Sequence, residues 1–408
     1  MRAVAVVVVA LIALAAAGVL LTTVQVLLVR RLRRKRRPFE AAGRRAGFRP
    51  GGSSAGAPRV SILKPLSALD DGLEENLASF TAIRGTSFEV ILSAASEDDP
   101  AVPAARRVLA RHPDAPFRLV VGGPRPRRLA NPKVLRLLAA ERAASGEILF
   151  VSDSNIQVSP DDVAETVACF EDPAVGCVSS LFVGDGARSL GAAVESLHLL
   201  TFVVPGAALA EATGFPCVVG KSMAISRRTL DAVGGFPAFL DVLAEDQALG
   251  VAVRAAGFRV AVSPVVVKNV VVTRTLRTAL ARQVRWNKIR WSFSKALYFG
   301  ELLLNPFPIA LLACGAAAVL SPTHLSAAAA FAGFVASVRI VQADALARLT
   351  GARLTGAHLA LAPIKDLLQL AAQLAPLLSS EVVWNGHRAR LGPGSLLLPS
   401  RREPALAA

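Results

Sequence analysis

The chain has 408 residues, of which 53% are hydrophobic, and a formal net charge of +16. This length allows a domain of ordinary size with additional elements, and the apolar content is high for a soluble protein and predicts attachment to a membrane. The positive charge suits either nucleic acid or an anionic membrane surface. The four cysteines form no C-x-x-C pair, which argues against a structural zinc or disulfide framework and fits reduced thiols in the cytosol.

Residues 3–29 contain no charged residue and can cross a hydrocarbon layer of about 30 Å as a helix. A cleavable signal peptide is the alternative, because Arg2 precedes the apolar stretch. However, arginines follow the stretch where a small-residue cleavage site would be expected. We therefore predict a retained transmembrane helix over residues 1–29, with its positively charged end in the cytoplasm.

Residues 30–58 are expected to form a basic juxtamembrane segment and a linker. Ten Lys/Arg and one acid lie within residues 30–49, where the aromatic residues are Phe39 and Phe48. Nucleic-acid readers usually add aromatics that stack on bases, whereas a basic cluster directly after a transmembrane helix suits anionic lipids. We expect the lipid bilayer, and no nucleic acid, as partner; the Pro- and Gly-rich residues 50–58 read as a flexible linker.

A catalytic domain is predicted over residues 59–274, where short β-rich runs alternate with helical patterns. Such alternation predicts an α/β fold with a mostly parallel, Rossmann-like sheet, helices on both faces and ligands at the carboxyl ends of the strands. The β-rich runs are residues 60–63, 89–92, 118–121, 148–151, 175–179 and 259–262, and the helical runs are residues 74–83, 101–111, 131–145 and 161–170.

An acidic cluster follows the second β-rich run. Glu97 and Asp98 stand there just before an expected helix. Their carboxylates could accept hydrogen bonds from a uracil N–H or from ribose hydroxyls, or they could simply cap the helix. Further on, Lys133 lies in the first turn of an expected helix, where it could reach a phosphate or remain solvated.

Asp153 lies one residue beyond the run that ends at Ser152, and Asn155 stands two residues further on. In an extended chain both side chains lie on the same side. Their oxygens are suitable ligands for a divalent cation, Mg²⁺ or Mn²⁺, that bridges to a diphosphate. The alternative is a strand-end turn in which Asp153 caps the next helix.

Two later segments could complete an active site. Asp246 precedes an expected helix and could accept the proton of an attacking hydroxyl, or only cap the helix. Residues 277–290 read as a cationic amphipathic helix at the bilayer surface. Its Arg282 and Arg285 could stabilise the charge of a leaving diphosphate, and Trp286 could lie at the lipid interface.

The chain is apolar again after Tyr298, and the expected regions are an interfacial helix over 275–300, a membrane region over 301–380 and a cytoplasmic tail over 381–408. Candidate spans are residues 302–320, 324–338 and 358–378. The third contains Lys365 and Asp366, so one of these segments could be re-entrant or interfacial. Three spans here and one at the N-terminus would place the tail in the cytoplasm.

Taken together, these segments resemble the ceramide glucosyltransferases and their bacterial relatives, from residue 60 to about residue 390. The resemblance implies an inverting, membrane-bound enzyme with a glycosyltransferase A-type fold. The segments that carry it are residues 60–66 (VSILKPL), 74–77 (EENL), 98–100 (DDP), 122–123 (GG), 131–133 (NPK), 152–156 (SDSNI), 213–217 (TGFPC), 234–235 (GG), 244–246 (AED), 282–286 (RQVRW) and 383–388 (VWNGHR).

The family pattern D, D, D, (Q/R)xxRW implies roles for individual residues. Asp153 matches the second Asp and Asp246 matches the third, which is the catalytic base. Arg282, Arg285 and Trp286 match the last element and would bind the donor. Ser96 stands where the first Asp is expected, so Glu97 or, preferably, Asp98 would take over its contact with uracil.

The resemblance also implies the substrates. We expect a UDP-sugar donor, with glucose preferred, and a membrane lipid acceptor, with ceramide preferred. Transfer of N-acetylglucosamine to a hopanoid lipid is the nearest alternative, and a processive polysaccharide synthase is another, although it would need more membrane helices. The expected location is the bacterial inner membrane, with the catalytic domain facing the cytoplasm.

Overall fold

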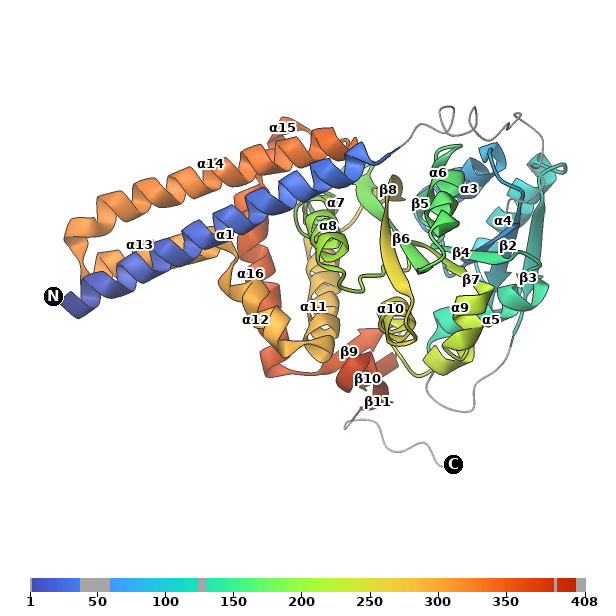
Figure 1. Cartoon of the computed structure of the whole chain (residues 1–408). Coiled ribbons are helices and arrows are strands. Elements are labelled where there is room, and N and C mark those ends of the chain that lie inside the picture. Colours follow the sequence, from blue (N-terminus) through green and yellow to red (C-terminus); the bar gives the residue numbers. More distant parts are fainter. Residues whose placement is uncertain (1, 37–58, 124–129, 385–386, 401–408) are drawn as a thin grey trace.

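The computed structural model describes residues 2–36, 59–123, 130–384 and 387–400. Figure 1 shows two regions: long helices at one end of the molecule and a sheet flanked by helices at the other. The long helices are α1 (Arg2–Arg34), α13 (Pro306–Leu320) and α14 (Leu325–Thr350), which pack against one another. Most of the expected basic segment and linker lies outside the described residues.

Within the described residues, eight strands form one sheet in the order β3-β2-β1-β4-β7-β6-β8-β5. The pairs β1–β2, β2–β3, β1–β4 and β6–β8 are parallel, and β4–β7, β6–β7 and β5–β8 are antiparallel. All six predicted strands are present, so the expected mostly parallel sheet is confirmed. The strands are β1 (Val60–Pro65), β2 (Phe88–Ala94), β3 (Phe117–Val121), β4 (Ile148–Ser152), β5 (Ile156–Gln157), β6 (Val175–Asp185), β7 (Ser222–Ser226) and β8 (Arg259–Val270).

Helices cover both faces of this sheet because its central strands are apolar on both sides. Val60 and Ile62 of β1 pack into one core with helices α3, α4 and α6, while Leu63 packs into a second core with α5 and α10. The α-helices around the sheet are α3 (Leu73–Ala78), α4 (Ala101–Arg111), α5 (Pro132–Ala143), α6 (Asp162–Val167), α7 (Leu190–His198), α8 (Val204–Thr213), α9 (Arg227–Ala232) and α10 (Glu245–Ala255).

The chain then forms a helical region and a second, small antiparallel sheet in the order β11-β10-β9. The remaining α-helices and strands are α11 (Leu276–Phe293), α12 (Lys295–Leu303), α15 (Gly356–Ala360), α16 (Ala362–Leu378), β9 (Glu381–Trp384), β10 (His387–Leu391) and β11 (Leu397–Pro399). The short 3-10 segments are η1 (Ser79–Ala82), η2 (Ala168–Glu171), η4 (Phe236–Phe239), η5 (Pro322–His324) and η6 (Pro393–Ser395), and η3 (Leu199–Val203) is a π-helical turn between α7 and α8.

Three described helical stretches are long and apolar enough to cross a membrane, namely residues 6–34, 190–213 and 322–350. A fourth would be formed by α12 and α13 together, which meet at a bend of 59°. The stretch at 190–213 is mostly buried inside the protein. The helices α15 and α16, where a span over residues 358–378 was expected, are not among these stretches: α16 has 17 residues, and several of them are polar.

Two of these polar residues belong to an ion cluster that joins α16 to α14. Asp366 accepts from Arg339 Nε at 2.7 Å, and Lys365 Nζ lies 2.6 Å from the other Asp366 carboxylate oxygen. All three side chains are buried. Ions in a low-dielectric interior are tolerated only when each has a partner of opposite charge. The cluster therefore holds α16 in a fixed position against the apolar helices.

Replacing Asp366 with leucine should destabilise the protein by about 3–5 kcal/mol, because two buried cations lose their anion. The exposed pair of Asp344 and Arg348, with 2.8 Å between its atoms, provides a control: Asp344→Ala should cost less than about 1 kcal/mol. Thermal unfolding of the detergent-solubilised chain measures both variants. Equal losses in the two variants would contradict the role given to the buried cluster.

Candidate active site

Asp153 lies directly after β4 and carries two cationic partners. Its carboxylate oxygens are 3.0 Å from Lys133 Nζ and 3.3 Å from Lys221 Nζ. Burial alone would raise the pKa of Asp153, but the two ammonium groups hold it well below its usual range. The backbone carbonyl of Asp153 accepts from Lys64 Nζ at 2.9 Å. Asp153 is therefore an anion that is held in place from several directions.

Lys133 connects this strand end to α10. The side chain of Asn131 caps α5 and accepts from the Lys133 backbone N–H at 2.8 Å, which fixes the first turn. Lys133 Nζ lies 3.0 Å from Glu245 Oε1 and donates to the Gly220 carbonyl at 3.1 Å. Burial alone would lower the pKa of Lys133, but Asp153 and the acids of α10 raise it well above its ordinary value. Lys133 therefore stays charged.

Glu245 and Asp246 are adjacent in sequence but have different surroundings at the start of α10. Glu245 is buried and accepts from Asn131 Nδ2 at 2.9 Å. Asp246 is half-buried, and its Oδ2 accepts from the Gly220 N–H at 2.6 Å. Glu245 therefore supports the frame of the site, whereas Asp246 lies at the backbone of the loop that precedes β7.

This loop, residues 214–221, is anchored to α10 and to β6. Gln247 Nε2 donates to the Pro216 carbonyl at 2.8 Å, and its Oε1 accepts from the Val218 N–H at 3.2 Å. These two bonds are made by a single side chain one turn into α10. The loop is therefore held against α10, and Asp246 has a fixed position relative to the loop and to the helix.

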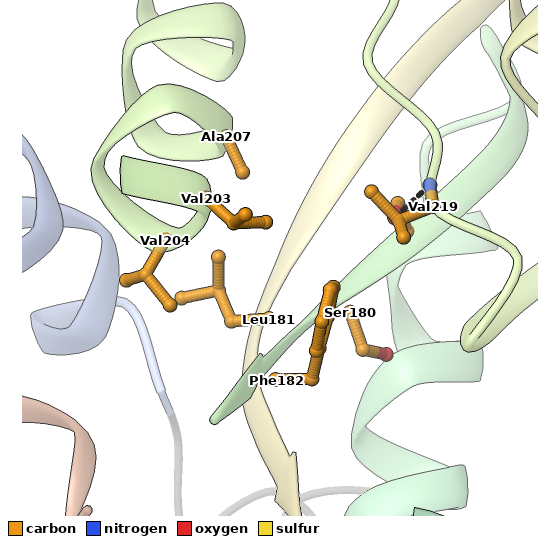
Figure 2. A pocket seen from close by; sticks show the side chains of 8 residues that line it. Ser180, Leu181, Phe182, Val203, Val204, Ala207 and Val219 are labelled. Atoms are coloured by element: carbon orange, nitrogen blue, oxygen red, sulfur yellow. Dashed lines mark hydrogen bonds between the residues drawn. The ribbon is translucent and has the colours of Figure 1, made fainter. Parts of the chain in front are cut away.

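Figure 2 shows the opposite side of the same loop, where Val219 lies across a small apolar cavity from η3 and α8. Its backbone N–H donates to Ser179 Oγ at 3.1 Å, which ties the loop to β6. The cavity is lined by Ser179, Ser180, Leu181, Phe182, Val203, Val204, Ala207 and Val219. Because this cavity is small and apolar, it supports packing beneath the loop and supplies no chemistry of its own.

Arg274, just before α11, and Arg282 and Arg285 in its first half form a guanidinium cluster. Glu195 of α7 lies 3.2 Å from Arg282 and 3.0 Å from Arg274, and the Arg282 guanidinium stands 5.1 Å from the centre of the Trp286 ring. In the described part of the chain, no carboxylate lies within ion-pair distance of Arg285. Burial and the neighbouring Arg282 lower the pKa of Arg285 to about 10. Arg285 is thus a cation whose anionic partner is not supplied by the described chain.

The two clusters adjoin each other through Lys221. Burial lowers the pKa of Lys221 to about 8; Asp153 opposes this shift, and the charges of Arg282 and Lys133 add to it. Asp153 and Asp246 are thus brought together by Lys133 and Gly220, and the guanidinium cluster is near enough for the charge of Arg282 to act on Lys221. Arg285 itself makes no direct contact with either acid.

Glu97 and Asp98 are placed differently. Both are exposed after β2, and Glu97 pairs with Arg106 at 2.8 Å. The side chain of Asp98 makes no hydrogen bond or ion pair with any described residue. The neighbouring Asp99 accepts from the backbone N–H groups of Ala68 and Ala101. Contact between uracil and Glu97 or Asp98 therefore stays a prediction.

Sequence reasoning missed Lys64, Lys221 and Glu195 as members of these clusters. Lys64 is buried, and burial lowers its pKa to about 7, against the opposing effect of Asp153 and Asp70. A lysine within an apolar strand such as residues 60–66 is a usable signal, because an unpaired buried lysine is costly. Glu195 has no comparable signal, since its partners lie about 80 residues further along the chain.

The predicted metal ligands can be tested for fit. Asp153 Oδ2 and Asn155 Oδ1 both lie near Lys221 Nζ, at 3.3 and 3.1 Å. The two oxygens therefore point toward the same position, which the ammonium group of Lys221 occupies in this structure. Among the described residues, no group of three or more His, Cys, Asp or Glu could hold a metal ion. Asp153 and Asn155 thus fit as a partial ligand set that a diphosphate would have to complete.

Comparison with known proteins shows the family of the chain. The sequence profile of glycosyl transferase family 21 matches residues 7–397. Ceramide glucosyltransferase 1 of Caenorhabditis elegans is 31% identical over 209 residues, which cover 50% of this chain and 44% of that protein. Ceramide glucosyltransferase 3 of the same organism is 29% identical over 209 residues, covering 50% and 45%. The matched region spans less than half the length of each of these relatives.

Among solved structures, the chain is similar to the mannosyltransferase PcManGT from Pyrobaculum calidifontis in complex with GDP-Man and Mn²⁺. The TM-score is 0.46 and the identity 22%, with 88% of this chain and 99% of that chain covered. A similarity at this level is too low to transfer the position of any residue.

Replacing Gly220 with alanine should disrupt the site while leaving the fold intact. An added Cβ would lie 2.6 Å from Lys133 Nζ and 3.1 Å from Asp246 Oδ2, so these side chains must move. We expect sugar transfer to fall at least about tenfold, which corresponds to about 1.4 kcal/mol of lost transition-state stabilisation. Gly206 serves as the matched control, since its added Cβ meets no atom within 4 Å. Comparable losses in both variants would contradict this account of Gly220.

Proposed function

The chain belongs to glycosyl transferase family 21, and from this membership we propose that it transfers a hexose from a UDP-sugar to the hydroxyl group of a membrane lipid. It is a nucleotide-sugar-dependent glycosyltransferase with a glycosyltransferase A-type fold. Glucose is the proposed sugar and ceramide the proposed acceptor, because the curated relatives carry the name ceramide glucosyltransferase. The observation that carries the proposal is that Asp153 and Asp246 meet through Lys133 and Gly220 beside a guanidinium cluster.

The cations of this site support binding of a diphosphate. Arg285 has a charge without a carboxylate partner among the described residues, and Lys221 shares its anionic partner with Lys133. A diphosphate would supply the missing anion, and guanidinium groups bind phosphate oxygens in a bidentate geometry. Arg282 and Arg285 then stabilise the charge that grows on the leaving group. Two further donor contacts are proposed. One is Trp286, which lies beneath Arg282, and the other is Asp98 or Glu97, which would contact the nucleobase.

Asp246 is the proposed catalytic base. One of its oxygens accepts from the Gly220 N–H and the other from the Gln247 N–H, so the carboxylate is oriented while it stays half-buried. A carboxylate has further lone pairs with which to accept the proton of an acceptor hydroxyl. With a single base, the hydroxyl attacks the anomeric carbon in line with the departing diphosphate, which inverts the configuration.

A divalent cation, Mg²⁺ or Mn²⁺, is the proposed cofactor, with Asp153 and Asn155 as its protein ligands. When bound, such a cation neutralises charge on the diphosphate. Lys221 must then give up part of its contact with these two oxygens. Burial lowers the pKa of Lys221 to about 8 and so disfavours its charged form.

The proposed location is the bacterial inner membrane, with the catalytic domain facing the cytoplasm. The apolar stretch at residues 6–34 ends in Arg31, Arg33 and Arg34, and basic residues at the end of a span favour the cytoplasmic side. The sheet follows that end of α1 in the chain, so it would lie on the same side. A UDP-sugar made in the cytoplasm would then reach the site directly.

The proposed function predicts a defined product. Membranes that contain the chain, given labelled UDP-glucose and ceramide, should yield a labelled glycolipid that mass spectrometry identifies as hexosylceramide. Label that enters a lipid only from UDP-N-acetylglucosamine and a hopanoid acceptor would replace the proposed substrates by that pair. A long polysaccharide product would indicate a processive synthase.

Asp246→Asn should lower turnover by about 10²–10⁴-fold, because the amide cannot accept the proton. Its carbonyl can still accept from the Gly220 N–H, so UDP-sugar affinity should stay nearly unchanged. Asp231→Asn, an exposed acid of α9, is the control and should keep full turnover. A variant at Asp246 that retains most of its activity would exclude this residue as the base.

A further inference from the structure

A cluster of polar side chains outside the donor site is buried between three helices. We name it the amide layer. Figure 1 shows the three helices, α7, α11 and α16, between the long apolar helices and the sheet. Each side chain in the layer belongs to a residue that is at most 2% exposed, and the members are His198, Gln283, Asn287, Gln369 and Gln373.

Most hydrogen-bonding atoms of the amide layer have no partner among the described residues. Both amide atoms of Gln283, both of Gln373 and both ring nitrogens of His198 are unpaired. Asn287 Oδ1 accepts from Gln369 Nε2 at 3.4 Å, yet Asn287 Nδ2 and Gln369 Oε1 remain unpaired. Each such group costs about 1–3 kcal/mol when it is buried without a partner. So many in one place indicate that another molecule completes their hydrogen bonds.

The unpaired groups form one row on α11 and one row on α16. Gln283 and Asn287 are one turn apart on α11, Gln369 and Gln373 are one turn apart on α16, and the two helices pack against each other. His198 adds a third side from α7, at the start of the π-helical turn η3. Such turns occur frequently at functional sites. The members of the layer thus come from three helices that contact one another.

The layer adjoins the donor site through α11. The His198 ring lies 6.0 Å from the ring of Trp286, which in turn lies beneath Arg282. Gln283 is the direct sequence neighbour of Arg282. A molecule held by the layer would therefore lie beside the guanidinium cluster, on the side toward the long apolar helices.

The charges around the layer indicate what kind of molecule it accepts. Arg290 is paired with Glu301 at 3.0 Å, and Lys365 with Asp366 at 2.6 Å. Each of these cations already contacts a carboxylate, although Lys365 shares Asp366 with Arg339, so an anionic phosphate would have to compete with a buried carboxylate there. The unpaired atoms are neutral donors and acceptors in similar number, which match hydroxyl and amide groups.

We propose that the amide layer binds the uncharged headgroup of a lipid that carries hydroxyl and amide groups, and so selects the acceptor. The role as acceptor rests on the proposed function, whereas binding of such a headgroup does not. The hydroxyls and the amide would pair with both rows of side chains, and the hydrocarbon chains would extend toward the long apolar helices.

The test compares two buried glutamines in the full chain. Gln373→Met removes two unpaired atoms at nearly constant volume, so the melting temperature should stay unchanged or rise. Crosslinking to a photoreactive ceramide, measured without UDP-sugar, should weaken about two- to tenfold, and the apparent KM for ceramide should rise by the same factor. UDP-sugar affinity should not change.

Gln342 of α14 is the matched control, because both of its amide atoms are bonded, to Arg339 at 2.7 Å and to Thr23 at 2.9 Å. Gln342→Met should lower the melting temperature and leave ceramide crosslinking unchanged. If Gln373→Met behaves in the same way, the layer is satisfied by water alone and the proposal is overturned.

Lipid competition separates this inference from the proposed function. Unlabelled ceramide should displace the photoreactive probe better than phosphatidylglycerol, and displacement by phosphatidylglycerol at equal strength would overturn the neutral-headgroup assignment. If Gln373→Met weakens ceramide crosslinking but the wild-type protein transfers no hexose to ceramide, the acceptor role alone is refuted. Hexosylceramide formed equally well by Gln373→Met would refute the amide layer alone.

Discussion

The ammonium group of Lys133 is the point at which three separate parts of the domain meet. It contacts Asp153 after β4, Glu245 at the start of α10 and the Gly220 carbonyl before β7. Without this cation, two carboxylates would face each other across a buried space, and one of them would have to take up a proton. The position of Asp246 depends on the same contact, because Gly220 binds both Lys133 and Asp246. The geometry of the site therefore follows from one ion-paired lysine.

Helix α11 links this site to the membrane region. Its Arg282 and Trp286 face Glu195 and His198 of α7, while Asn287 faces Gln369 of α16. A helix presents residues four apart on one face, so one segment can serve a charged site and an amide-lined one at the same time. The ion cluster of Arg339, Lys365 and Asp366 fixes α16 against α14. In this way the long apolar helices determine where the polar face of α16 lies.

Buried charge is distributed in two ways in this protein. In the ion cluster of α14 and α16 both cations contact the one carboxylate of Asp366, and neither is left without an ion-pair partner, which suits a structural element. Around Asp153 the lysines share partners, and Arg285 has no carboxylate partner in the described chain. A site that must bind and release an anion cannot neutralise all of its cations beforehand, because the anion would then gain little on binding. The excess of cations is consistent with the proposed diphosphate donor.

Much of the architecture could be predicted from local pattern. The six β-rich runs and the helices between them are encoded by apolar periodicity, and the family motifs identified Asp153, Asp246, Arg282 and Arg285 as a set. The strand β7 was not predicted, because its short run SMAIS begins and ends with polar residues and its pairing with β4 and β6 is antiparallel. The candidate span at 358–378 stays a prediction, because α15 and α16 divide this segment and α16 carries buried polar residues that apolar length alone does not reveal.

The sequence by itself determined the order of the elements and the chemistry available to them, because both depend on neighbouring residues. Only the tertiary structure decided which polar side chains became hydrogen-bond and ion-pair partners. Lys221 and Glu195 joined the charged clusters of the candidate site, and Glu245 became buried while Asp246 stayed half-buried. Five buried polar side chains on three helices were left with most of their hydrogen-bonding atoms unpaired. These outcomes depend on contacts between residues far apart in the chain, and hydrophobic periodicity carries no information about which buried polar group will meet which.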